Sequence, residues 1–175
     1  KRVEPLATSV GSDLVMPCDV TDDTAVAATF EDLAKRWSQV DFVLHAIAYS
    51  DKEQLKGQYA ETTRDNFLRT MDISCYSFTA VARHAAPLMK AGGSLLTLTY
   101  FGAERVMPHY NVMGVAKAAL EASVRYLAVD FGNENIRVNG LSAAPVYICS
   151  AICPVASPAK STMSIVGITC LLYTS

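Results

Sequence analysis

Short apolar runs alternate with longer amphipathic runs along most of this chain, and this alternation limits the possible folds more than any other feature of the sequence. Four runs have the length and the Val, Leu and Ile content of buried strands: residues 13–20, 41–49, 94–100 and 136–145. Three longer runs repeat apolar residues at helical spacing: residues 21–37, 63–89 and 110–131. Crossovers of this length predict an α/β fold with a doubly wound parallel sheet, which binds ligands at the carboxyl ends of its strands.

The composition describes a globular chain without a strongly charged surface. Apolar residues make up 51% of the 175 residues, enough to bury a sizeable core in one domain. The 15 Lys and Arg are balanced by 17 Asp and Glu, so the basic field that attracts nucleic acid or anionic lipid is missing. The chain starts with polar residues instead of a signal peptide, and no apolar run reaches the ~18 residues of a membrane span. We expect a cytoplasmic protein with no nucleic acid and no membrane as partner.

The five cysteines show no CxxC spacing and no nearby set of histidine or acidic partners. This pattern predicts reduced thiols and no metal site.

Tyr110 and Lys117 are seven residues apart at the start of the third helical run, shortly after the strand-like run that ends at Tyr100. Seven residues bring two side chains back to within about 20° of the same helix face, about 10 Å apart along the axis. An ammonium so placed can hold ligand hydroxyls and lower the pKa of the phenol, while the phenol donates a hydrogen bond to a carbonyl oxygen. The same spacing also fits a core tyrosine and a solvated lysine, so it leaves both interpretations open.

Residues 99–128, TYFGAERVMPHYNVMGVAKAALEASVRYLA, closely resemble a loop and helix of the NADH-type bacterial enoyl-acyl-carrier-protein reductases. This family belongs to the short-chain dehydrogenase/reductase superfamily, and the resemblance covers about residues 1–146. Most of the superfamily has a tyrosine four residues before the lysine, a position that Met113 occupies here. The Tyr-x6-Lys spacing is the version found in the enoyl reductases. The resemblance implies a Rossmann-like sheet that is incomplete at the N-terminus.

The resemblance also implies a reaction, the reduction of the trans-2 double bond of enoyl-acyl-carrier-protein thioesters in fatty-acid elongation. The implied cofactor is NADH, with NADPH not excluded, and the implied partners are acyl carrier protein and the other subunits of a homotetramer. Tyr110 would donate a hydrogen bond to the thioester oxygen, Lys117 would hold the nicotinamide ribose, and Tyr100 would line the substrate pocket. The implied cofactor-binding residues are Asp19, Val20, Ala46, Ile47, Ala48, Leu98, Thr99, Lys117 and Val146.

The sequence departs from the family pattern in several places. Ala48 and Ala144 stand where the family usually has glycine, and Ile148 stands where it usually has a threonine that reaches the cofactor. The first residues resemble the end of the second helix of the fold, so we expect the first strand and its glycine-rich phosphate-binding turn to be missing. We expect residues 1–146 to form a partial dinucleotide-binding domain. Residues 147–175 do not resemble the family, and we interpret them as a tail unrelated to the fold that arose as a translation artefact.

Two alternatives to an enoyl reductase remain at this point. The chain could be another short-chain carbonyl reductase, such as a 3-oxoacyl reductase, although Met113 disfavours this. It could also be a non-catalytic chain that associates with itself through its long helices. Because the predicted phosphate-binding turn is missing, we expect the isolated chain to be inactive.

Overall fold

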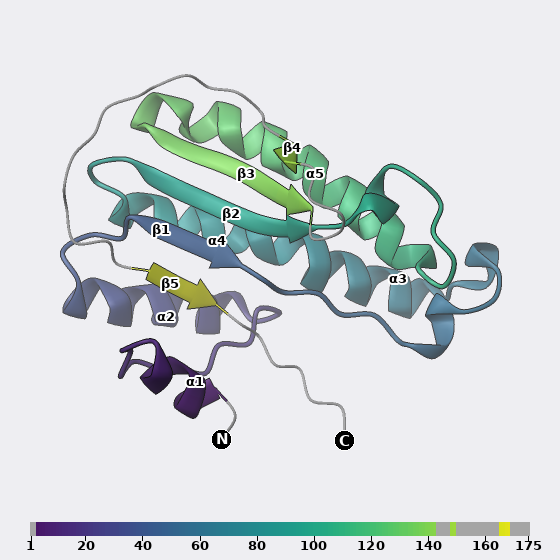
Figure 1. Cartoon of the computed structure of the whole chain (residues 1–175), viewed down its shortest axis with the longest axis horizontal. Helices are drawn as coiled ribbons and strands as arrows, with labels where there is room; N and C mark the ends of the chain where they lie inside the picture. The colour runs from purple at the N-terminus through teal and green to yellow at the C-terminus, as the bar shows by residue number, and fades with distance from the viewer. Residues whose placement is uncertain (1–2, 143–147, 150–164, 169–175) are drawn as a thin grey trace.

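The computed structural model describes residues 3–142, 148–149 and 165–168, and these form a sheet with helices packed against it (Figure 1). The strands are β1 (Phe42–His45), β2 (Gly93–Thr99), β3 (Ile136–Ser142), β4 (Ile148–Cys149) and β5 (Ile165–Ile168). Their order across the sheet is β4-β3-β2-β1-β5. The neighbours β5, β1, β2 and β3 run parallel, and β4 is antiparallel to β3. The predicted α/β fold with a parallel sheet is confirmed.

The α-helices are α1 (Val3–Ser9), α2 (Asp23–Arg36), α3 (Arg64–Met71), α4 (Ser77–Ala85) and α5 (Asn111–Phe131). Short helical turns are η1 (Glu53–Leu55), η2 (Tyr59–Glu61), η3 (Asp72–Tyr76), η4 (Ala86–Leu88), η5 (Phe101–Ala103) and η6 (Gly132–Glu134). The turn η3 is π-helical and joins α3 to α4 in one continuous run. The three long helices predicted from the sequence are therefore confirmed, with boundaries that differ from the predicted ones by at most four residues.

Side-chain caps explain where two of these helices begin. The Asp22 carboxylate accepts a hydrogen bond from the Thr24 backbone N–H at 2.8 Å, at the start of α2. The Thr63 hydroxyl accepts one from the Asn66 backbone N–H at 3.3 Å, at the start of α3. Each cap satisfies a donor that has no partner inside the helix, which fixes the first turn.

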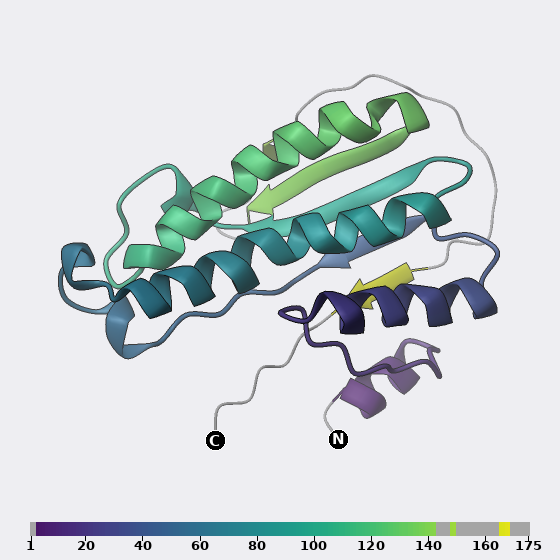
Figure 2. The same cartoon turned by 180° about the vertical axis from the view of Figure 1, so that it is seen from behind.

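Three helices cover one face of the sheet. Figure 1 shows α2, α4 and α5 behind the strands, and Figure 2, seen from the opposite side, shows them in front. The strands β1, β2 and β3 are neighbours in chain order, so successive right-handed crossovers place their connecting helices on the same side. The second helical layer that a doubly wound sheet implies is not among the described residues.

Alternate residues of the strands point into the core between sheet and helices. Val43 and Leu95 are fully buried there, and Phe78 and Leu120 meet them from α4 and α5. The residues between them on the strands, such as Leu96, are half-buried on the other face. This alternation is the expected pleat of a strand with one face on the core.

The predicted strand at residues 13–20 is not found. Leu14, Met16 and Cys18 are half-buried against the core, while the residues between them are exposed, so the run is extended. A strand also needs a neighbour for its backbone ladder, and no described strand pairs with this run. The prediction of a strand at residues 13–20 was therefore wrong.

The last part of the chain also differs from the expectation that it takes no part in the fold. Two short segments of residues 147–175, the strands β4 and β5, pair with β3 and β1 at the two edges of the sheet. The origin of this tail as a translation artefact stays a prediction.

Candidate active site

Tyr100, Tyr110 and Lys117 lie at the carboxyl edge of the sheet or on the helix that starts there. Tyr100 directly follows β2, and η5 then begins the loop that leads to α5. Tyr110 immediately precedes the first residue of α5, and Lys117 lies in the second turn of that helix. The carboxyl ends of parallel strands are where this architecture binds ligands.

The rings of Tyr100 and Tyr110 pack edge to face. Their centroids are 4.9 Å apart and their planes are inclined by 61°. Gly102 and Gly114 make room for this pair: a Cβ atom on Gly102 would lie 2.4 Å from a ring carbon of Tyr110, and one on Gly114 would lie 2.8 Å from the Gly102 carbonyl oxygen. The loop and helix therefore approach each other at two glycines, and the Tyr110 ring fills the space between them.

The phenol of Tyr110 stays protonated across the physiological range. Burial, and to a smaller extent the neighbouring Tyr100, raises its pKa to about 12. The sequence analysis expected the Lys117 ammonium to lower this pKa, and that prediction was wrong because burial dominates. A protonated phenol is a hydrogen-bond donor, so Tyr110 can donate to an oxygen on which negative charge develops.

Lys117 is buried, with only 5% of its surface exposed, and its ammonium contacts the end of β2. Nζ donates a hydrogen bond to the Leu98 carbonyl oxygen at 2.7 Å. Burial lowers the pKa of Lys117 to about 8, against smaller opposing contributions from Cys75 and Glu121. One turn further along α5, Glu121 accepts a hydrogen bond from the Thr99 hydroxyl at 2.6 Å. Two adjacent residues of β2 are thus tied to two residues on one face of α5.

The depressed pKa of Lys117 predicts that the protein becomes more stable as the pH rises above 8. Between the folded pKa of about 8 and the ordinary value of 10.5, the unfolded chain keeps a proton that the folded chain has released. We expect the free energy of unfolding to rise by about 2 kcal/mol more in the wild type than in Lys117→Met between about pH 7 and about pH 9.5, measured by urea unfolding. Lys35→Met, at an exposed lysine, is the control and should keep the wild-type slope. Equal slopes in wild type and Lys117→Met would contradict the assignment.

His45 is a buried structural histidine. Ser77 Oγ donates to the Ile73 carbonyl oxygen at 2.6 Å, so it accepts the hydrogen bond from His45 Nε2 at 2.8 Å. Nδ1 is then unprotonated and accepts from Thr97 Oγ1 at 2.9 Å. Burial, and then the charge of Lys117, lowers the pKa of His45 to about 3. The neutral ring joins β1, β2 and α4 just below the strand ends.

The other predicted cofactor residues lie in different environments. After β1, Ala46 is half-buried, Ile47 is 3% exposed in the core and Ala48 is exposed. A ligand at this strand end would therefore meet the backbone here, since the Ile47 side chain is used for packing. Leu98 is half-buried and Thr99 is buried at the end of β2.

The predicted adenine-binding pair Asp19 and Val20 lies just before α2. The Asp19 carboxylate accepts hydrogen bonds from the Thr21 backbone N–H at 2.9 Å and from the Thr21 hydroxyl at 2.8 Å, and these bonds lower its pKa. Val20 is 2% exposed. Val146 lies outside the described residues. Among the residues that are described, no group of three or more His, Cys, Asp or Glu side chains could hold a metal ion.

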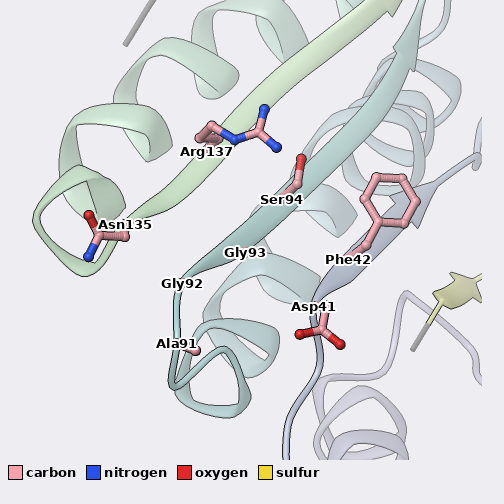
Figure 3. Close-up of a pocket in the computed structure, with 8 residues that line it drawn as sticks. All are labelled: Asp41, Phe42, Ala91, Gly92, Gly93, Ser94, Asn135 and Arg137. Atoms are coloured by element: carbon pink, nitrogen blue, oxygen red, sulfur yellow. The ribbon is translucent and has the colours of Figure 1, made fainter. Parts of the chain in front are cut away.

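An open cleft of about 490 Å³ lies at the opposite, amino end of the strands (Figure 3). It is lined by Asp41, Phe42, Ala91, Gly92, Gly93, Ser94, Asn135 and Arg137. Phe42 and Gly93 are the first residues of β1 and β2, whereas Tyr100 follows the last residue of β2. The cleft is therefore separate from the tyrosine and lysine site.

Sequence reasoning missed four residues of the site: Gly102, Gly114, Asn111 and Glu121. The position of Glu121 four residues after Lys117 was a usable signal, because this spacing places both on one helix face. The contacts of Gly102 and Asn111 involve residues distant in sequence or brought close by the loop, which no local pattern encodes.

A family model described as Enoyl-(Acyl carrier protein) reductase matches residues 1–152. The chain is 64% identical over 151 residues to the Enoyl-[acyl-carrier-protein] reductase [NADH] 1 of Rhizobium meliloti (strain 1021), a match that covers 86% of this chain and 56% of the relative. It is 49% identical over 153 residues to the FabI enzyme of Bacillus subtilis (strain 168), covering 86% of this chain and 59% of the relative. The chain thus spans a little over half the length of these curated relatives.

Solved structures give the same result for the fold. The enoyl-(acyl-carrier-protein) reductase of Anaplasma phagocytophilum, solved in complex with NAD, superposes with a TM-score of 0.81 at 61% sequence identity. That match covers 82% of this chain and 55% of the solved one. The enzyme of Aquifex aeolicus VF5 gives a TM-score of 0.80 at 47% identity, over 86% of this chain and 60% of the other.

Proposed function

We propose that this chain, which belongs to the enoyl-(acyl carrier protein) reductase family, carries the catalytic tyrosine and lysine of an NADH-dependent reductase of enoyl thioesters. The observation that carries the proposal is the Tyr110 phenol, packed on Tyr100 and kept protonated beside the end of β2, on the helix that also holds buried Lys117. A half-buried donor and a buried cation at the carboxyl edge of a parallel sheet suit the reduction of a carbonyl-conjugated double bond.

Tyr110 supplies electrophilic assistance in this proposal. Negative charge develops on the thioester carbonyl oxygen when the adjacent double bond is reduced, and a donor already in position stabilises that charge without reorganising. The pKa of about 12 keeps the donor proton on Tyr110 at any physiological pH. Tyr100 packs against the ring and lines the same side of the site.

The residues at the strand ends fit the nicotinamide end of a dinucleotide. Lys117 Nζ has three N–H groups and donates one to the Leu98 carbonyl oxygen, so others remain for ribose hydroxyls. Leu98, Thr99 and the backbone of residues 46–48 would border the cofactor on the two strands, with Asp19, Val20 and Val146 as further proposed contacts. NADH supplies the hydride when bound, and the protein orients it and the substrate. No described residue forms a glycine-rich phosphate turn.

We further propose acyl carrier protein as the partner that presents the enoyl chain, a homotetramer as the assembly and the cytoplasm as the location. Apolar side chains exposed on the long helices support self-association: Tyr126 and Val129 on α5 are 76% and 78% exposed, and Leu68 on α3 is 57% exposed. Within the described residues, no helix is both long and apolar enough to cross a bilayer.

Substrate choice tests the proposal. Residues 3–142 can replace the matching segment of the Rhizobium meliloti relative, giving a chimera of full length in which the proposed site residues from Asp19 to Lys117 come from this chain. We expect the chimera to oxidise NADH with a trans-2-enoyl thioester and not with a 3-oxoacyl thioester, followed by absorbance of the reduced cofactor. The 175-residue chain is assayed in parallel. Turnover of the 3-oxoacyl substrate alone would overturn the proposal in favour of a carbonyl reductase, and a soluble, folded chimera inactive on both would overturn it altogether.

A further inference from the structure

The backbone on both sides of Tyr110 has an unusual conformation. His109 has φ +59° and Asn111 has φ +31°, whereas Tyr110 between them has φ −121°. Residues other than glycine rarely have a backbone in the left-handed region. Two such residues on either side of one position need support from neighbouring structure. The direction of the Tyr110 ring depends on whatever supplies that support.

Asn111 supplies a contact of this kind through its side chain. Its Nδ2 group lies within hydrogen-bond distance of three backbone carbonyl oxygens, those of Gln54 at 3.4 Å, Lys56 at 3.3 Å and Gly57 at 3.3 Å. The three carbonyls converge because the chain turns at η1 and continues through Gly57, which has φ +74°. One amide group thus joins the start of α5 to a segment more than fifty residues earlier.

The segment that Asn111 contacts is itself held firmly on its other side. Gln54 Oε1 accepts hydrogen bonds from the Thr63 backbone N–H at 3.0 Å and from its hydroxyl at 3.1 Å, and Thr63 caps α3. The Asp51 backbone N–H donates to Asn66 Oδ1 at 3.0 Å. Residues 51–57 are therefore anchored to α3, and Asn111 is anchored to them.

We propose that Asn111 is a positioning residue, which holds Tyr110 in its reactive orientation by fastening the start of α5 to the carbonyls of residues 54–57. The inference rests on the proposed function, in which Tyr110 is the hydrogen-bond donor to the substrate. It also means that the orientation of Tyr110 depends on the position of residues 51–57. That segment follows residues 46–48, the strand end assigned to the cofactor. An ångström of displacement at a reacting group is enough to lower a rate about 100-fold.

A different explanation is that Asn111 is present only because asparagine tolerates a positive φ. Two substitutions separate the explanations. Asn111→Gly keeps the conformational freedom and removes the amide, and Asn111→Asp keeps the shape but turns a carboxylate toward three carbonyl oxygens. If only the backbone conformation mattered, both variants would behave like the wild type. If the hydrogen bonds matter, both lose function, and Asn111→Asp loses more.

Asn135→Gly is the matched control. Asn135 also has a positive φ, +57°, but it lies at the amino edge of the sheet, after η6. We expect this variant to leave the site unchanged. It therefore separates the general effect of placing glycine at a left-handed asparagine from the specific effect at residue 111.

The experiment combines kinetics in the chimera with a spectroscopic measurement on the 175-residue chain. We expect Asn111→Gly to lower kcat about 10-fold and Asn111→Asp about 100-fold, with the KM for NADH changed less than 3-fold. In the chain labelled with ¹³C at the tyrosine ζ-carbon, the Tyr110 resonance, assigned by its loss in Tyr110→Phe, should titrate at lower pH in Asn111→Gly, because a displaced ring loses part of the burial that raises its pKa. Wild-type kcat and wild-type Tyr110 titration in Asn111→Gly would overturn the inference.

The outcomes also separate this inference from the proposed function. If Tyr110→Phe leaves the chimera fully active, the proposed function fails whatever Asn111 does. If Tyr110→Phe abolishes activity and Asn111→Gly keeps it, only the positioning role fails. Should Asn111→Asp unfold, as judged by its circular dichroism melt, Asn111→Gly and its Tyr110 resonance decide the question alone.

Discussion

Tyr110→Phe is expected to lower kcat of the chimera about 100- to 1,000-fold while leaving its stability nearly unchanged. The substitution removes one hydroxyl and keeps the ring that packs on Tyr100 and fills the space beside Gly102. Losing a single preorganised donor to a developing oxyanion costs about this much in other enzymes. The KM for NADH should change little, because in the proposed site the cofactor is held by Lys117 and the strand ends.

Tyr59→Phe is the control for that experiment. Tyr59 lies in η2, outside the helices proposed to associate, and is 47% exposed, so removing its hydroxyl should change neither kcat nor stability. Initial rates with the enoyl thioester and thermal unfolding, measured side by side, give both quantities. A Tyr110→Phe chimera with more than about half of the wild-type kcat would exclude Tyr110 as the donor, since a donor to developing charge cannot be removed at so small a cost.

The part of the fold that local sequence encodes was predictable. The helices α2 and α5 carry a readable pattern of spacing, and capping residues such as Asp22 mark α2, so their bounds were found within a few residues. The run at residues 13–20 was not assigned correctly, because an extended segment becomes a strand only if another strand pairs with it. Pairing depends on distant residues, which the run itself does not specify.

The site, like the fold, was predictable only in the features that local sequence determines. The sequence placed Tyr100, Tyr110 and Lys117 at the carboxyl edge of the sheet, because strand order and helix period determine that position. It gave the wrong direction for the pKa of Tyr110, because that pKa depends on how deeply the ring is buried and not on the distance along the chain to Lys117. The contacts of Asn111 with residues 54–57 likewise exist only in three dimensions.

Gly102→Ala should be nearly as damaging as loss of the phenol, although residue 102 has no reactive group. Its new Cβ would lie 2.4 and 2.7 Å from two ring carbons of Tyr110 and 3.2 Å from one of Tyr100. The new methyl is fixed to the backbone and cannot turn away, so the Tyr110 ring has to shift from its position against Tyr100. We expect kcat of the chimera to fall about 100-fold as Tyr110 moves, and the free energy of unfolding to fall by about 1–3 kcal/mol from overpacking.

Gly132→Ala separates this steric effect from the general effect of replacing glycine. Gly132 has φ −57° and no atom within 4 Å of the position of a new Cβ, so alanine fits there without strain. That variant should keep its activity and gain up to about 1 kcal/mol of stability, because alanine restricts the unfolded chain. Urea unfolding and kcat, measured for both variants, complete the comparison. If Gly102→Ala keeps the wild-type kcat and the wild-type free energy of unfolding, Tyr110 can move without loss of activity. Glycine at position 102 would then not be needed to keep the Tyr110 ring in its orientation.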